Sequence, residues 1–234
     1  MQIALFDLDH TLIPFDSGSV FTRFLAEHGA LPDSFAAQYL DYCHQYAAGR
    51  LDMVEMHRFT VGALSVHAPE RLGAWLDEFE ALIAPLVPPA AHALVREHQA
   101  AGHRCALVTA TTRIVAAPFG RVLGLAEVLC TEPAFDARGH CTGEVIGVPC
   151  FREHKLTHVK AWLAREGKGL GSVARSWFYS DSANDLPLLL AVSDPVAVNP
   201  DPTLAAHAAT AGWPVRRIGA EPPDPRLPTH GGSR

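Results

Sequence analysis

Two aspartates and a threonine follow a short apolar run at the start of this chain, which begins MQIALFDLDHT. The run 3–6 is long enough for one buried strand and too short for a membrane span or a signal peptide. At alternate positions after it come Asp7, Asp9 and Thr11. Side chains two residues apart point the same way while the chain stays extended, so the carboxylates can converge on a hard cation such as Mg²⁺. A carboxylate left free there can attack phosphorus, although the same acids would also suit a solvated loop.

Hydroxyl groups follow a second strand-like run, residues 105–108. The segment after it reads TATTR and contains Thr109, Ala110, Thr111 and Arg113. A hydroxyl and the free backbone N–H groups at the start of the next helix can bind phosphate oxygens. The competing interpretation is that Thr109 or Thr111 only caps that helix.

Two acids and an amide crowd the turn after a third run, residues 177–180. Asp181 is placed to give a metal a further oxygen ligand. Asp185 can orient the metal-binding groups through hydrogen bonds without binding the metal itself. Helix capping by Asn184 or Asp185 would explain one of these acids but not the pair.

A lysine stands near the start of a helix expected at about 153–166, where the helix dipole disfavours cations. Attraction to a phosphate dianion and a carboxylate would offset this unfavourable interaction of Lys155 with the helix dipole. A solvated Lys155 is the simpler alternative, and Lys160 or Lys168 could be the lysine that matters instead.

The elements that must position these groups are strands alternating with helices. Strands are expected at 2–7, 105–109, 128–130, 177–180 and 195–198, a hairpin at 134–148, and helices near 94–98, 112–123, 153–166, 184–192 and 202–212. This alternation indicates a parallel sheet covered on both faces, with its ligand beyond the carboxyl ends of the strands. We therefore predict an α/β fold with a Rossmann-like three-layer core.

A proline-bounded stretch with only helical signals interrupts this pattern after the first strand. We interpret it as a small all-helical insertion, which we call the cap segment. The predicted division is a core of 1–13 and 86–220, a cap segment of 14–85 and a disordered Pro/Gly-rich tail of 221–234.

The composition excludes several classes of protein. The 234 residues carry 19 basic and 25 acidic side chains, a net charge of −6, without a Lys/Arg cluster, so no nucleic-acid partner is expected. No apolar run approaches membrane-spanning length, so no membrane partner is expected either. The five cysteines lack CxxC spacing and are expected to be reduced thiols of a cytoplasmic protein. A zinc site could also be drawn from the cysteines and histidines between residues 130 and 154. The spacing of these residues fits no common zinc-ligand pattern; they are Cys130, His140, Cys141, Cys150 and His154.

The four polar clusters, in this order, resemble the haloacid dehalogenase superfamily of phosphatases. The matching residues are DLDHT at 7–11, Thr109 in LVTAT, Lys155, and SDSANDLPLL from Ser180 on. The helical insertion directly after the first motif is similar to the cap of the subgroup that contains phosphoserine phosphatase. The segment CTGEVIGVPCF at 141–151 also looks like an uncharacterised branch of that subgroup.

This resemblance implies roles for the clustered residues. Asp7 would attack the phosphoryl group and form an aspartyl-phosphate, and Asp9 would protonate the leaving alcohol and then activate water. Thr109 and Lys155 would hold the non-bridging oxygens. Mg²⁺ would be held by Asp7, the backbone carbonyl of Asp9 and Asp181, while Asp185 would anchor Lys155 or a metal-bound water.

The same resemblance implies a small phosphorylated metabolite as substrate, similar to phosphoserine or histidinol phosphate. Asp16 lies where phosphoserine phosphatases have an amine-binding glutamate, and Asn184 would support the pocket. The other candidates for substrate contacts are Thr11, Ala110 and Arg113, with Arg50 and Arg58 as further possible anion ligands. The sequences TATT and SDSAND depart from the glycine-rich turns of the phosphoserine enzymes, which puts phosphoserine specificity in doubt.

Other interpretations of the same chain stay open. A phosphotransferase or mutase would differ only in the acceptor, and a non-catalytic phospho-acceptor or binding module would keep the scaffold. Tyr39, Tyr42 and Tyr46 lie at helical spacing and are expected in the cap core rather than stacked on a ligand. A monomer or a homodimer is expected.

Overall fold

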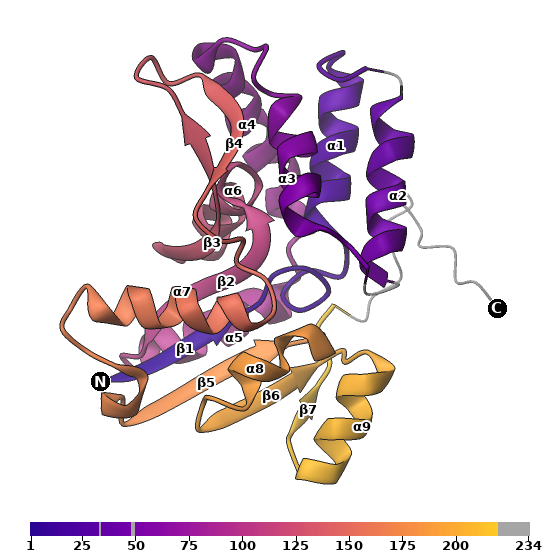
Figure 1. The fold of residues 1–234 in the computed structure, drawn as a ribbon. Coiled ribbons are helices and arrows are strands. Elements are labelled where there is room, and N and C mark those ends of the chain that lie inside the picture. The colour runs from indigo at the N-terminus through magenta and orange to yellow at the C-terminus, as the bar shows by residue number, and fades with distance from the viewer. Residues whose placement is uncertain (33, 48–49, 220–234) are drawn as a thin grey trace.

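A seven-stranded sheet forms the centre of the molecule in the computed structural model, which describes residues 1–32, 34–47 and 50–219 (Figure 1). The strand order is β4-β3-β2-β1-β5-β6-β7, and neighbouring strands are parallel except for the antiparallel pair β3 and β4. The strands are β1 (Gln2–Phe6), β2 (Arg104–Thr112), β3 (Glu127–Phe135), β4 (Cys141–Ile146), β5 (Arg175–Ser180), β6 (Asp194–Val198) and β7 (Val215–Arg216).

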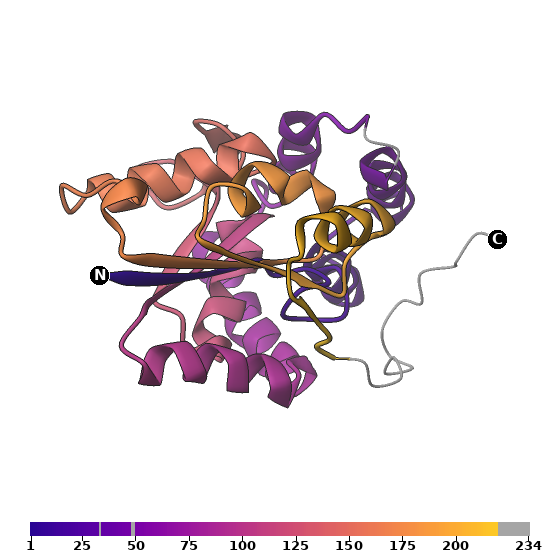
Figure 2. The same ribbon diagram turned by 90° about the horizontal axis from the view of Figure 1, so that it is seen from below.

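Helices cover both faces of the sheet, which is seen nearly edge-on in Figure 2. One face carries α7 (Glu153–Ala164), α8 (Leu186–Leu189) and α9 (Pro202–Ala211), and the other carries α5 (Pro89–Ala100) and α6 (Arg113–Leu123). The fold is therefore the three-layer α/β arrangement that the alternating pattern predicts.

Strand β1 shows how the sequence divides the core between these faces. Ile3 and Leu5 pack in one cluster with Trp162 and other buried apolar residues of α7, α8 and α9. Ala4 and Phe6 belong to the cluster on the opposite face, with α5 and α6. All four strand side chains are fully buried, as expected for a central parallel strand covered on both sides.

Helices are the only regular elements in the described part of the cap segment. It contains α1 (Ser17–Glu27), α2 (Phe35–Ala47), α3 (Met53–Gly62), α4 (Pro69–Ile83) and the short 3₁₀ turn η1 (Ala84–Leu86). These helices lie together above the carboxyl ends of the strands in Figure 1. Tyr39 and Tyr42 are buried, as predicted, and the side chain of Tyr46 lies outside the described residues.

The cap segment packs tightly on the rest of the chain. Phe79 of α4 contacts Phe21 of α1 and Phe119 of α6 edge-to-face, with ring centroids 4.9 and 5.9 Å apart. On the other side, α3 packs along β4, where Arg58 pairs with Glu144 at 2.8 Å. A single apolar cluster therefore runs across both parts, and the division of the chain at residues 14 and 85 stays a prediction.

Some elements differ from the expected ones. Strands β2 and β3 extend beyond the expected 105–109 and 128–130, and β7 had no sequence signal because it is only two residues long. The expected helix 184–192 is instead a 3₁₀ turn, η3 (Ala183–Asp185), followed by the four-residue α8, which has Pro187 in its first turn. The predicted tail, 221–234, lies outside the described residues.

None of the helices among the described residues is long and apolar enough to cross a membrane. The five cysteines are free, and the described residues contain no cluster of histidines, cysteines and acids that matches the zinc alternative. The cytoplasmic location and the monomer-or-homodimer state stay predictions.

Candidate active site

The predicted residues meet where β1, β2 and β5 end. Asp7 directly follows β1, and its N–H donates to the Tyr179 carbonyl at 2.9 Å, which carries the β1–β5 pairing one residue beyond the strand. The chain then turns sharply, because the Leu8 carbonyl accepts the N–H groups of Thr11, Leu12 and Ile13. This turn folds Thr11 back against the carboxylate that it follows by four residues.

Lys155 links two of the acids. Its Nζ lies 2.7 Å from Asp7 Oδ1 and 2.7 Å from Asp185 Oδ2, and all three side chains are buried. Ser180 Oγ donates to the same oxygen of Asp185 at 2.7 Å. The two other candidate lysines, Lys160 and Lys168, are exposed, and the role of Lys155 stays a prediction.

Burial and charge act in opposite directions on this lysine. Burial by itself lowers the pKa of Lys155, but the carboxylates of Asp185 and Asp7 raise it well above its ordinary value. Burial also raises the pKa of Asp185, against the effect of the lysine. Lys155 is therefore a permanent buried cation directly beside Asp7.

Thr11 joins a third acid to this group. Its hydroxyl lies 3.1 Å from Asp7 Oδ2 and 3.2 Å from Asp181 Oδ1, and it accepts the Asp181 N–H at 3.0 Å. Burial, followed by the charges of Asp7 and Asp185, raises the pKa of Asp181 to about 9. Asp181 thus holds a proton at neutral pH unless a cation replaces it.

Asp9 has a different environment. Its Oδ1 accepts the N–H of Ser17 at 2.6 Å, and its Oδ2 accepts the Thr111 hydroxyl at 3.0 Å. Burial, then the charges of Asp16 and Asp7, raise the pKa of Asp9 to about 7. A carboxyl group poised near neutral pH can both give up and take back a proton, which suits a general acid–base.

The acids fit a magnesium ion in their chemistry and their charge. The buried carboxyl groups of Asp7 and Asp185 share Lys155, the one buried lysine or arginine among the described residues, and the partly buried Asp181 adds a third acid beside Thr11, so a further cation would be favoured. The structure's described residues hold no group of three histidine, cysteine or acidic side chains arranged as a metal cage. Mg²⁺ does not require one, because it typically uses one or two carboxylates and fills its other positions with water and substrate phosphate.

The predicted phosphate-binding residues lie at the end of β2. Thr109 is buried, and its Oγ1 accepts the N–H of Thr111 at 3.2 Å. The Ala110 carbonyl accepts the Thr131 hydroxyl at 2.8 Å. Neither Thr109 nor Thr111 caps the next helix, because the N-cap of α6 is Thr112.

The other residues that were predicted to contact the substrate already have hydrogen-bond partners within the protein. Arg113 pairs with Glu132, with Nε 2.7 Å from Oε2, so a substrate anion would have to compete with that ion pair. Asn184 accepts a hydrogen bond from Arg152 Nε at 3.2 Å. Asp16 is the N-cap of α1, and it accepts Ser19 N–H at 2.6 Å and the Tyr39 hydroxyl at 3.1 Å.

Several residues of the site carried no specific sequence signal. Ser180, Ser17 and Thr111 orient the acids, but a serine or threonine beside an acid is common in any chain. Arg152 adopts a positive φ of 50° just before α7. Only its position three residues before Lys155 could have marked it.

Comparison with known proteins agrees with this geometry. The family model for haloacid dehalogenase-like hydrolases matches residues 4–190. A histidinol-phosphatase of Neisseria meningitidis is 37% identical over 92% of this chain and 97% of its own. A solved structure of a Bordetella pertussis protein of unknown function shares 44% identity with a TM-score of 0.85, over 92% of this chain and 97% of that one. A substrate-bound phosphoserine phosphatase, 18% identical with a TM-score of 0.60 over 87% and 89% of the two chains, shares the fold.

The α/β fold with acids at the carboxyl ends of its central strands is consistent with a haloacid dehalogenase-like hydrolase, and the family-model match over most of the chain shows this family. This chain belongs to the haloacid dehalogenase superfamily and, within it, is a phosphatase.

Proposed function

We propose that this protein hydrolyses a small phosphomonoester in the presence of Mg²⁺ through an aspartyl-phosphate on Asp7. The observation that carries the proposal is the pairing of two acids that lie two residues apart in different surroundings. Asp7 is held in place by Lys155 at 2.7 Å and Thr11 at 3.1 Å, while Asp9, two residues on, has its pKa raised to about 7.

Each acid has a distinct task in the proposed first step. An Asp7 oxygen forms a bond to phosphorus while the bond from phosphorus to the alcohol oxygen breaks, and the proton of Asp9 passes to that alcohol oxygen. In the second step Asp9 takes a proton from water, whose oxygen attacks phosphorus. Phosphate leaves, and the Asp7 carboxylate is restored.

The remaining residues neutralise and position charge. Lys155 and the hydroxyl of Thr109 are proposed to hold the non-bridging oxygens, with the Ala110 N–H beside them. Mg²⁺, bound by Asp7, Asp181 and the Asp9 carbonyl, would supply the further positive charge that phosphoryl transfer needs. Asp185 would act by fixing Lys155 through its 2.7 Å contact.

The substrate is proposed to be an amino-alcohol phosphate of the histidinol phosphate type. The support is the relative named histidinol-phosphatase, which matches nearly the whole length of both chains. Phosphoserine is the alternative, and a transfer of the phosphoryl group to a second alcohol would use the same first step.

The test is phosphate release from a panel of phosphomonoesters, with Mg²⁺ and with EDTA. The wild type is compared with Asp7→Asn and with Asp41→Asn, a control acid exposed on α2. We expect metal-dependent release that is lost in Asp7→Asn and kept in Asp41→Asn. Release that persists in Asp7→Asn would refute the mechanism, and phosphate appearing on an added alcohol would identify a transferase.

A further inference from the structure

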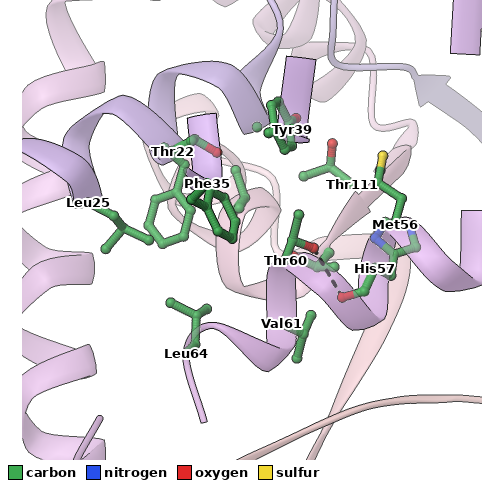
Figure 3. Close-up of a pocket in the computed structure, with 14 residues that line it drawn as sticks. Thr22, Leu25, Phe35, Tyr39, Met56, His57, Thr60, Val61, Leu64 and Thr111 are labelled. Carbon is green, nitrogen blue, oxygen red and sulfur yellow. Dashed lines mark hydrogen bonds between the residues drawn. The ribbon is translucent and has the colours of Figure 1, made fainter. Parts of the chain in front are cut away.

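A small hollow lies beside Thr111, whose hydroxyl donates to the proposed proton-transfer residue Asp9. It has a volume of about 50 Å³ and lies between helices α1, α2 and α3 on one side and the end of β2 with the start of α6 on the other. Figure 3 shows Thr111, Met56 and His57 grouped on one side of it, across from Leu25 and Thr22. We call it the cap cavity.

His57 is an unusual residue to find in its wall. The side chain is 1% exposed, and neither ring nitrogen has a hydrogen-bond partner. Burial lowers the pKa of His57 to about 4, although the Ala110 carbonyl acts in the opposite direction. The ring is therefore neutral at pH 7, and even if one nitrogen donates to the Ala110 carbonyl, the other is left without a partner. A buried polar group without a partner is uncommon and calls for an explanation.

The cap cavity adjoins the place where the alcohol must leave. Thr111 lines the cavity and donates to Asp9 at 3.0 Å. Tyr39 also lines it and donates to Asp16 at 3.1 Å. An alcohol protonated by Asp9 would thus have its carbon skeleton at or in this cavity, with His57 in the wall.

The charges around the cap cavity are of one sign. Among the described residues that line it there is no lysine or arginine, and the acids Asp9 and Asp16 lie one hydrogen bond behind its wall. A carboxylate placed there would be buried without a counter-charge, which is strongly unfavourable. An uncharged or cationic group with its own donor and acceptor would meet no such cost.

We infer that the cap cavity takes the alcohol side of the substrate, that His57 hydrogen-bonds an uncharged polar group on it, and that substrates bearing a carboxylate are rejected. This inference rests on the proposed hydrolase function and specifies its substrate class. The cavity must enlarge to admit a ring, and Met56, an unbranched and adaptable side chain in its wall, can move to allow this.

The experiment compares kcat/KM for histidinol phosphate, phosphoserine and methyl phosphate, which lacks a side group. In the wild type, histidinol phosphate should exceed phosphoserine by at least about tenfold, the effect expected of an unpaired buried group. His57→Leu should lower the ratio of histidinol phosphate to methyl phosphate by about tenfold, and His57→Gln, which keeps a donor and an acceptor, should restore part of it. His44→Gln on the exposed side of α2 is the matched control.

A purely structural His57 would behave differently. His57→Leu would then change all substrates alike, and Gln would restore nothing selectively; that result, or a wild type that prefers phosphoserine, would overturn the inference. Failure of the hydrolase proposal is separate, since it would show as methyl phosphate hydrolysis that is absent or does not depend on Asp7. Thermal unfolding confirms that each variant is folded.

Discussion

Among the residues that the structure describes, Lys155 is the only lysine or arginine that is buried, and it contacts two buried acids. It contacts Asp7 and Asp185 at 2.7 Å each, and no water-exposed path dilutes these charges because all three groups are buried. Removing one member of such a group leaves the others as uncompensated buried charges. Lys155 therefore combines a structural role with its proposed role toward the phosphate.

Lys155→Met should separate these two roles. We expect a loss of about 3–5 kcal/mol in the free energy of unfolding without metal, since the buried carboxylates lose their counter-charge. Adding Asp185→Asn should recover part of the stability but no activity. Urea unfolding and phosphate release measure the two effects. Equal activity in Lys155→Met and wild type would exclude the lysine from the chemistry.

Asp9 should be needed for turnover but not for folding. Asp9→Asn keeps a side chain of the same shape but cannot exchange a proton, so we expect kcat to fall by about 10²–10⁴-fold. The amide oxygen can still accept the Ser17 N–H, and the amide NH₂ can donate to the Thr111 hydroxyl oxygen, so thermal unfolding should change little. A variant with near wild-type kcat would rule out Asp9 as the proton donor.

At the scale of elements, close packing of α6 on β3 positions the end of β2. A side-chain carbon added at Gly120 would lie 2.6 Å from Val128 Cγ2 and 3.2 Å from the Leu125 carbonyl oxygen. Gly73, in the middle of α4, has open space around the same position.

Alanine at these two helical glycines should therefore have opposite effects. Gly120→Ala should destabilise the protein by about 1–3 kcal/mol through overpacking. Gly73→Ala should stabilise it by about 0.5–1 kcal/mol because alanine restricts the unfolded chain and favours the helix. Denaturant unfolding compares them; a stabilising Gly120→Ala would show that the layers are not closely packed there.

A buried histidine couples α5 to β5. His98 Nε2 lies 2.8 Å from the Tyr179 hydroxyl, and Nδ1 lies 2.9 Å from His103 Nδ1. Burial, and then the charge of His103, lower the pKa of His98 to about 4. Tyr179 in turn accepts the Asp7 N–H through its carbonyl, so this contact supports the strand that carries the acid.

Stability should therefore fall in mild acid. Between the ordinary pKa of about 6.5 and the folded value of about 4, the unfolded chain binds a proton at His98 that the folded protein does not. Its contribution is complete above pH 6.5 and decreases as the pH is lowered toward 4, by about 3 kcal/mol. His98→Phe should flatten this dependence in urea titrations, whereas the half-buried His92→Phe should leave it unchanged.

For the whole molecule, the sequence predicted the site best where polar side chains directly follow a strand. The four clusters at Asp7, Thr109, Lys155 and Asp181 had clear patterns, and the structure brings Asp7, Lys155 and Asp181 together. Contacts between distant segments had no such pattern. The packing of α3 on β4 depends on how whole layers pack, which periodicity along one chain does not encode, and the Lys155–Asp185 pair was expected only from the family resemblance.

The acids of the site outnumber the one lysine that neutralises them, so the melting temperature of the whole protein should depend on Mg²⁺. We expect the Tm of the wild type to rise with Mg²⁺, because a ligand that binds only the folded state stabilises it by mass action. Asp181→Asn, which removes one acid of the group, should raise the Tm without metal and reduce the response to Mg²⁺. An identical response in Asp181→Asn would exclude this residue as a ligand.

The most direct test of the central claim is the site of covalent phosphorylation. Asp9→Asn is incubated with Mg²⁺ and a substrate, quenched in acid, digested with pepsin and examined by mass spectrometry. The account predicts one phosphoryl group on the peptide that contains Asp7, lost when Asp7→Asn is added. Phosphorylation at another residue, or rapid turnover with no label on that peptide, would contradict it.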